Sequence, residues 1–300
     1  MLFNCRDRNL NSLDLVGVER YKMKLNLANK ISLVALDMDG TTLNSQNVIS
    51  ERNKRAIAVA REGGLNLAIA TGRMYTASLH LIEATGIDGT SVFYNGGVLW
   101  NPKTDKIIYE KRLGYDLSLE VFEFLLGLGV YTQIYDDKNF FVKDRSDPNA
   151  MWYESVAKHT GTELGEKFEG YRCNANKYLA MFSTREELQV AFEKVTAHFG
   201  EKVYVTTTAD TFLEVMHPDV NKGVGLKMLA GSYSVPREET LAIGDGGNDI
   251  PMIEWAGVGI AVANATENVK QAANIVAPSN DEDAVAEVLE AVLENNKNFA

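Results

Sequence analysis

The sequence has very few cysteines and lacks any long apolar run. Its 300 residues include two cysteines, Cys5 and Cys173, which cannot form a disulfide framework and which suit a reducing compartment. No stretch approaches the ~20 apolar residues that a membrane-spanning helix requires. Asp14 also interrupts the one N-terminal stretch that could serve as the apolar segment of a secretory signal. These absences predict a cytoplasmic protein that does not bind membranes.

Positive charge is also scarce. The 30 lysines and arginines are outnumbered by 41 aspartates and glutamates, which gives a formal net charge of -11. Proteins that bind nucleic acids depend on clustered positive charge, so we do not expect a nucleic-acid partner. A small anionic substrate remains compatible with this balance, because a few local cations can hold one phosphate. Hydrophobic residues make up 45% and charged residues 24% of the chain, as in soluble globular proteins.

Two common kinds of active site lack support in the sequence. A Gly-x-Ser-x-Gly nucleophile elbow is absent, so a serine hydrolase is not favoured. The histidines share no spacing typical of metal ligands, and we interpret them as surface or core residues. They are His80, His159, His198 and His217.

Apolar strands and helices alternate at both ends of the chain. Three apolar runs, at 31–36, 65–70 and 91–94, predict buried strands with helices between them. The same alternation returns in the last third of the chain, with predicted strands at 240–243 and 258–262. This order predicts a doubly wound α/β fold, in which a Rossmann-like core is built on a parallel sheet.

The middle of the chain follows another pattern. Residues 131–142 and 203–215 predict antiparallel hairpins, and residues 177–182 predict a further strand. The helical and strand patterns therefore divide the chain into a core that is interrupted by an insert. We predict an α/β catalytic core at 31–97 and 217–300, an inserted α+β cap domain at 98–216, and an N-terminal extension at 1–30 to which the sequence assigns no order.

Acidic side chains gather where predicted strands end. Asp37 and Asp39 follow the first strand, Gly40 supplies flexible backbone for a turn, and Asp245 follows a later strand. Ligands of parallel α/β sheets bind at the carboxyl ends of the strands. Nearby carboxylates repel one another unless a cation intervenes, and a few that leave room for waters and a phosphate suit Mg²⁺. The alternative, in which Asp37 and Asp39 only shape a turn, would suit an isolated pair.

Three further polar clusters fit the binding of a phosphate group. Thr71 and Gly72 offer a hydroxyl and an open backbone N–H just before a predicted helix, where phosphates bind readily. Lys222 precedes another helix and either contacts an anion or lies in solvent. Asn248 and Asp249 belong to a glycine-rich segment that lets the chain approach a ligand closely, although either could also cap the next helix.

The four clusters resemble, in order, the four motifs of the haloacid dehalogenase-like hydrolase superfamily. These are an Asp-x-Asp-Gly-Thr strand end, a Thr, a Lys and a Gly-Asp-x-x-Asn-Asp loop, and the resemblance covers about residues 31–295. The α+β insert between the second and third motifs is similar to the type II cap of this superfamily. With the segments at 95–97 and 221–223, the chain most resembles the Cof-like sugar-phosphate phosphatases. That family usually has Asn-Gly-Ala where this chain has Asn-Gly-Gly at 95–97.

The resemblance implies a mechanism for the hydrolysis of a phosphate ester. Asp37 would be the nucleophile that forms an aspartyl-phosphate, and Asp39 would be the general acid and base. Mg²⁺ would be held by Asp37, the backbone carbonyl of Asp39 and Asp245, with Asp249 behind them or bound through water. The phosphoryl oxygens would contact Thr71, the N–H groups of Met38 and Gly72, Lys222 and Asn248.

We therefore predict a Mg²⁺-dependent phosphatase that acts on small phosphorylated metabolites, with sugar phosphates as substrates, as a monomer or small homo-oligomer. The insert would close over the site, where Lys177 and Asp210 are candidates for reading the substrate. The sequence also fits a solvated Lys177 and an Asp210 that only forms a turn. Three alternatives remain: a phosphomutase with the same intermediate, a phospho-accepting signalling domain, and a silent binding protein. Asp39 and the large insert argue against the signalling domain.

Overall fold

A five-stranded parallel sheet forms the centre of the computed structural model, which describes residues 23–208 and 211–299. The strand order is β14-β13-β12-β1-β2. Leu36 of β1 lies level with Ile243 of β12 and with Ile69 of β2. Every residue of β1 is buried, which explains its uniformly apolar sequence. The strands are β1 (Leu33–Leu36), β2 (Asn66–Ile69), β12 (Thr240–Gly244), β13 (Val258–Val262) and β14 (Ile275–Ala277).

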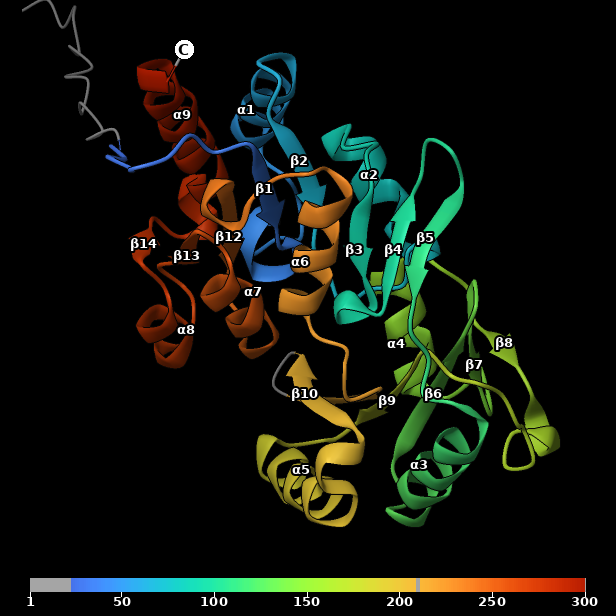
Figure 1. Cartoon of the computed structure of the whole chain (residues 1–300). Coiled ribbons are helices and arrows are strands. Elements are labelled where there is room, and N and C mark those ends of the chain that lie inside the picture. The colour runs from blue at the N-terminus through green and yellow to red at the C-terminus, as the bar shows by residue number, and fades with distance from the viewer. Residues whose placement is uncertain (1–22, 209–210, 300) are drawn as a thin grey trace, which may run out of the picture.

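Helices cover both faces of the parallel sheet (Figure 1). On one face, Ile57 of α1 and Val285 of α9 join the apolar cluster that contains Leu36. On the other face, Leu226 of α6 and Met252 of α7 belong to a second apolar cluster, which contains Ala35 of β1. The predicted doubly wound α/β architecture is therefore confirmed. The helices are α1 (Glu51–Glu62), α2 (Leu79–Thr85), α6 (Lys222–Ser232), α7 (Ile250–Trp255), α8 (Glu267–Ala272) and α9 (Ala284–Asn296).

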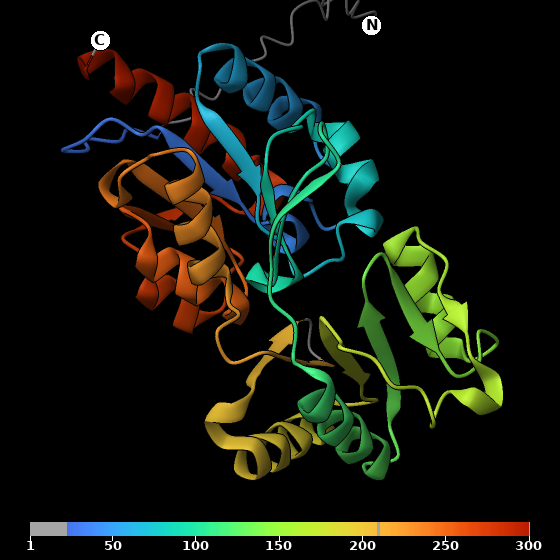
Figure 2. The ribbon, with the colours of Figure 1, turned by 45° about the vertical axis from the view of Figure 1, so that its right-hand side comes forward.

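A six-stranded sheet in the order β10-β11-β9-β6-β7-β8 lies beyond the carboxyl end of the parallel sheet (Figure 2). Its neighbouring strands are antiparallel except for β7 and β8. Phe122 of α3 and Val195 of α5 pack on one face of this sheet. The elements are α3 (Tyr115–Gly127), β6 (Tyr131–Asp136), β7 (Asn139–Val142), α4 (Pro148–Ala157), β8 (Thr162–Glu163), β9 (Lys177–Met181), α5 (Arg185–Phe199), β10 (Tyr204–Thr208) and β11 (Phe212–Met216). None of the helices in the described part of the chain is both long and apolar enough to cross a membrane.

A third sheet corrects one expectation for the core. The sequence pattern places residues 91–94 in the parallel sheet, but β3 (Ser91–Phe93) pairs antiparallel with β4 (Val98–Asn101). Strand β4 pairs in turn with β5 (Lys106–Glu110). On its other edge, β3 keeps one parallel bridge beside the end of β2, between Val92 and Ala70. This pairing favours a boundary after β5 rather than at residue 98, and the division into core and insert stays a prediction.

Residues 23–30, the last part of the expected N-terminal extension, lie along α9. The backbone N–H of Met23 donates to the carboxylate of Glu287 at 3.3 Å, and that of Leu27 donates to Asn295 Oδ1 at 3.1 Å. The side chains of Met23, Leu25 and Leu27 are partly buried against the core cluster. This segment therefore packs on the core, whereas residues 1–22 lie outside the described residues.

The start of α6 is fixed by two local contacts. The side chain of Asn221 caps the helix by accepting a hydrogen bond from the N–H of Val224 at 2.9 Å. Gly96, at φ 100°, lies so close that a methyl group on it would collide with the backbone carbonyl of Asn221. Lys222, the next residue, is thereby held with its side chain fully buried.

The cap at Asn221 leads to a prediction about stability. Asn221→Ala leaves the Val224 N–H without its acceptor, and we expect the free energy of unfolding to fall by about 1 kcal/mol. Asn221→Ser, which keeps a capping oxygen of similar reach, should retain most of the stability. Urea unfolding followed by circular dichroism measures both. Equal stability of the alanine variant and the parent would contradict this view of the helix start.

Candidate active site

Three acidic side chains meet at the carboxyl end of the parallel sheet. Asp37 follows β1 and Asp245 follows β12, which are neighbouring strands, and Asp249 lies in the loop after β12. One carboxylate oxygen from each of the three lies within 4.8 Å of the others. Asp37 and Asp249 are buried, while Asp245 is partly exposed. The structure therefore brings together three of the four acids that the sequence placed in one site.

The turn after β1 is shaped around Asp245. Gly40 has a φ of 79°, and a methyl group on it would collide with the Asp245 carboxylate. The hydroxyl of Thr41 donates to Asp245 Oδ1 at 2.7 Å. Gly40 and Thr41, which directly follow Asp39, thus fix the position of Asp245, which lies far along the sequence.

Lys222 connects two of the acids. Its Nζ donates to Asp37 Oδ1 at 2.6 Å and to Asp249 Oδ1 at 2.5 Å, and the side chain is fully buried. The other oxygen of Asp249 accepts hydrogen bonds from the N–H groups of Asp245 and Gly246, both at 2.9 Å. Asp249 therefore fixes both the lysine and the loop that carries Asp245.

Burial and crowding change the acidity of these groups. Burial raises the pKa of Asp37 well above its usual value, and the neighbouring Asp249 adds to the rise, while Lys222 opposes it. Burial also raises the pKa of Asp245 to about 6, again with a contribution from Asp249. For Lys222, burial alone lowers the pKa, but Asp249 and Asp37 outweigh it, so that the net pKa is raised and the ammonium is charged.

This donor set fits a divalent cation. One lysine does not balance three carboxylates, and besides burial, the neighbouring Asp249 contributes to the raised pKa values of Asp37 and Asp245. Oxygen-only ligands suit a hard cation, which would supply the missing positive charge. Since both oxygens of Asp249 already accept hydrogen bonds, Asp37 and Asp245 are better placed to bind a cation directly.

Asp39 lies apart from this cluster and pairs with an arginine that the sequence reasoning missed. Arg73 donates from Nε and Nη2 to the two carboxylate oxygens of Asp39, at 2.8 and 2.5 Å. Such a two-point contact fixes the orientation of the carboxylate. The Asp39 side chain remains 49% exposed, so a ligand can still reach it. The one signal for Arg73 was its place directly after Thr71-Gly72.

The predicted phosphate-binding residues lie on loops around the acids. Thr71 is buried after β2, and its hydroxyl oxygen accepts a hydrogen bond from the N–H of Arg73 at 3.1 Å. Gly72 packs so closely on Asn95 that a methyl group on it would collide with the Asn95 side chain. Asn248 donates to Asn95 Oδ1 at 2.9 Å, and Met38 is buried within the turn after Asp37. Asn95 thus touches two of the predicted binding positions, a contact that no local pattern indicates.

Lys177 does not lie in solvent, as one reading of the sequence allowed. It is buried, and its Nζ donates to the backbone carbonyl of Gly72 at 2.8 Å and to Glu214 Oε1 at 2.5 Å. Asp210, the other candidate for reading the substrate, lies outside the described residues.

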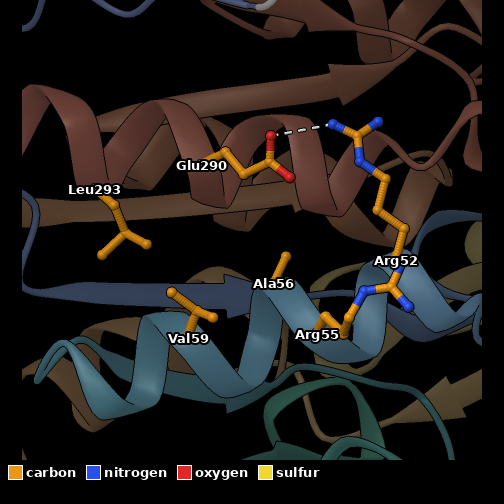
Figure 3. Close-up of a pocket in the computed structure, with 6 residues that line it drawn as sticks. All are labelled: Arg52, Arg55, Ala56, Val59, Glu290 and Leu293. Atoms are coloured by element: carbon orange, nitrogen blue, oxygen red, sulfur yellow. Dashed lines mark hydrogen bonds and ion pairs between the residues drawn. The ribbon is translucent and has the colours of Figure 1, made fainter.

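A groove between α1 and α9 is separate from the acidic cluster (Figure 3). Within it, Arg52 Nη2 lies 3.1 Å from Glu290 Oε2, so the groove carries charges of both signs. It contains none of the residues described above and lacks the buried donors of a phosphate site. Its lining consists of Arg52, Arg55, Ala56, Val59, Glu290 and Leu293.

Comparison with known proteins gives consistent matches over most of the chain. A family model described as haloacid dehalogenase-like hydrolase matches residues 34–289. The Bacillus subtilis (strain 168) protein phosphatase YwpJ is 30% identical over 289 residues, which is 88% of this chain and 100% of that protein. From the same organism, 5-amino-6-(5-phospho-D-ribitylamino)uracil phosphatase YitU is 30% identical over 269 residues, or 86% and 96% of the two chains.

A solved structure supports the same grouping. The crystal structure of a haloacid dehalogenase-like hydrolase from Bacteroides thetaiotaomicron matches with a TM-score of 0.78 and 29% identity. The match covers 88% of this chain and 100% of that chain. The similarity therefore includes both the parallel sheet and most of the elements around it.

The acidic cluster predicts a measurable cation affinity. We expect Asp245→Asn to weaken the binding of Mg²⁺ by at least about tenfold, because it removes a charged ligand while leaving the hydrogen bond from Thr41 intact. Isothermal titration of the full chain with Mg²⁺ measures this. The control is Asp88→Asn, an exposed acid paired with Arg61 at 3.0 Å, which should bind Mg²⁺ like the parent. Equal loss in both variants would argue for general charge effects instead of a site.

Proposed function

We propose a phosphatase reaction for this chain, which belongs to the haloacid dehalogenase-like hydrolase family. The observation that carries the proposal is the buried carboxylate of Asp37, paired with Lys222 and crowded by two further acids. A phosphate ester carries negative charge and can approach such a carboxylate only when nearby cations compensate. Lys222 and a bound Mg²⁺ would supply that compensation.

Asp37 acts as the nucleophile. Its carboxylate oxygen attacks phosphorus, the bond from phosphorus to the leaving oxygen breaks, and an aspartyl-phosphate forms. Water then attacks the same phosphorus, the bond to Asp37 breaks, and inorganic phosphate leaves. Lys222 Nζ, 2.6 Å from Asp37 Oδ1, lies where it can neutralise the transferred group in both steps.

Asp39 acts as the general acid and then as the general base. It protonates the departing oxygen in the first step and takes a proton from the attacking water in the second. Arg73 donates to both oxygens of this carboxylate and so fixes its orientation. Since both oxygens accept from Arg73, one of these hydrogen bonds must be released before that oxygen can carry the proton and pass it to the leaving oxygen of the substrate.

The remaining polar groups bind the phosphoryl oxygens and the metal. Mg²⁺ would be held by Asp37, Asp245 and the backbone carbonyl of Asp39, with Asp249 contributing through water. When bound, the cation neutralises charge on the phosphoryl group and orients it. The phosphoryl oxygens would be held by the Thr71 hydroxyl, the N–H groups of Met38 and Gly72, Lys222 and Asn248.

Small phosphorylated metabolites, with sugar phosphates first among them, are the proposed substrates. The six-stranded sheet contacts the loops of the site through Lys177 and Glu214, and we expect a substrate held between these two layers to be a small molecule. The relative YitU is named for a phosphorylated ribitylamino compound, a polyol ester that is chemically close to a sugar phosphate. We therefore group sugar phosphates and sugar-alcohol phosphates as one substrate class.

A screen of phosphorylated metabolites in the presence of Mg²⁺ tests this function. We expect release of inorganic phosphate, with the highest kcat/KM on sugar or sugar-alcohol phosphates, and loss of turnover when the metal is chelated. Isomerisation of a sugar phosphate without phosphate release would identify a phosphomutase instead. A phosphoprotein that persists without turnover would identify a phospho-accepting signalling domain.

The nucleophile assignment predicts the behaviour of Asp37→Asn. The amide is a poor nucleophile, so we expect hydrolysis to fall below detection, and circular dichroism should show an unchanged fold because the side chain keeps its size. Asp88→Asn, an exposed control, should keep full activity. Activity of Asp37→Asn within about tenfold of the parent would contradict the assignment.

The general acid assignment predicts a dependence on the leaving group. A sugar alkoxide needs a proton to depart, whereas p-nitrophenolate does not. We expect Asp39→Asn to lower kcat/KM for a sugar phosphate by about 10² or more, and to lower it much less for p-nitrophenyl phosphate. The constant kcat/KM is the correct measure because it reports only the steps up to the departure of the leaving group. Equal losses on both esters would exclude Asp39 as the acid.

A further inference from the structure

A line of buried polar side chains connects the six-stranded sheet to the loops of the active site. Lys177 of β9 and Glu214 of β11 form an ion pair at 2.5 Å, with both side chains almost fully buried. The second oxygen of Glu214 accepts a hydrogen bond from Asn95 Nδ2 at 2.5 Å. Asn95 Oδ1 in turn accepts a hydrogen bond from Asn248 Nδ2 at 2.9 Å. The line therefore ends on a residue of the proposed phosphate-binding set.

Asn95 is held in an unusual backbone conformation at the centre of this line. Its φ of 53° and ψ of 32° lie in the left-handed region, and the preceding Tyr94 also has a positive φ. Its backbone N–H donates to the carbonyl of Thr71 at 3.1 Å. Non-glycine residues in this region persist where the surroundings fix them. Here Thr71, Glu214 and Asn248 fix Asn95 from three directions.

Lys177 contacts the second proposed phosphate-binding loop, which contains Thr71 and Gly72. Its Nζ donates to the backbone carbonyl of Gly72 at 2.8 Å. The N–H of the same peptide unit, that of Arg73, donates to the Thr71 hydroxyl oxygen at 3.1 Å. Both ends of this peptide plane are therefore held. The Thr71 oxygen is the acceptor in this contact, so its own O–H can still donate toward a phosphoryl oxygen.

A buried ion pair does not by itself stabilise a fold, since removing two charges from water is costly. This pair has further partners that make its position specific. Lys177 Nζ lies 4.6 Å from the centre of the Tyr135 ring, and each oxygen of Glu214 accepts a hydrogen bond from a different residue. The contacts therefore define where the six-stranded sheet can sit on the core.

We propose that Lys177 and Glu214 are positioning residues of the active site. Through Gly72 and through Asn95, they set the Thr71–Gly72 loop and the side chain of Asn248, so that the phosphate-binding geometry is complete only when the six-stranded sheet is seated on the core. The inference rests on the proposed function for its consequence in catalysis. The positioning itself is a statement about the loops and can be tested without any substrate.

Hydrogen–deuterium exchange on the full chain provides that first test. We expect Lys177→Met to speed exchange in peptides covering 71–73, and Glu214→Gln to speed it in peptides covering 246–249, because each variant removes a contact that holds its loop. Gln keeps the size of Glu214, but it has only one oxygen. Its amide nitrogen would therefore face either Asn95 Nδ2 or Lys177 Nζ, which are both donors. Unchanged exchange in both loops would overturn the proposal, whatever the activity of the protein.

A matched control comes from an exposed ion pair beside the same sheet. Lys143 and Glu169 form an exposed ion pair at 2.7 Å, close to the end of β7. Lys143→Met and Glu169→Gln make the same chemical changes at exposed side chains outside the line of buried contacts. We expect both to leave the exchange of the two loops as in the parent. An equal effect of the control variants would mean that any lost charge loosens the protein, which would contradict specific positioning.

A double-mutant cycle tests whether Glu214 acts through Asn248. We expect Glu214→Gln to lower kcat/KM for a phosphate ester by about tenfold in the parent, but by less than about threefold in the Asn248→Ala variant. Losses that simply multiply would show independent effects and would overturn the proposal. If Glu214→Gln does not fold, Glu214→Asp replaces it, since it keeps the charge beside Lys177 while withdrawing from Asn95.

The two tests separate this inference from the proposed function. If the parent releases no phosphate from any ester, the proposed function fails, and the exchange measurement alone decides whether Lys177 and Glu214 position the loops. If the parent is active and the exchange of both loops is unchanged in the variants, the positioning fails and the phosphatase assignment stands.

Discussion

The contact on which the site depends is the buried bridge from Lys222 to Asp37 and Asp249. Without the ammonium, two buried carboxylates would face each other with no compensating charge in the protein, which is strongly unfavourable. The start of α6 places this lysine, and Asn221 and the close approach of Gly96 fix that start. The chemistry proposed for Asp37 thus requires that α6 begins at one residue and no other.

The parallel sheet sets the second constraint. Because β1 and β12 are neighbours and end at the same edge, acids more than two hundred residues apart are placed together without any local signal between them. The six-stranded sheet then covers this edge and contributes Lys177 and Glu214, whose contacts reach the loops after β2 and β12. The site is therefore built from one layer that carries the acids and another whose buried side chains contact the surrounding loops.

Much of this arrangement could be predicted from the sequence, because its signals are local. An apolar strand that ends in Asp37, or a glycine-rich loop that contains Asn248, is visible within ten residues. The fold class was predictable for the same reason. Contacts such as Arg73 with Asp39 or Asn95 with Glu214 join distant segments, and no local pattern indicates them. The antiparallel pairing of β3 was missed because a buried apolar strand fits either kind of sheet.

The most direct test of the account is to identify the residue that carries phosphate during turnover. The full chain, mixed with a labelled phosphate ester and Mg²⁺ and quenched in acid, can be digested and its phosphorylated peptide sequenced by mass spectrometry. We predict an acid-stable, hydroxylamine-sensitive phosphoryl group on Asp37, as expected for an acyl-phosphate. Label on another residue, or steady phosphate release with no labelled peptide under conditions that trap the intermediate, would contradict the central role of Asp37.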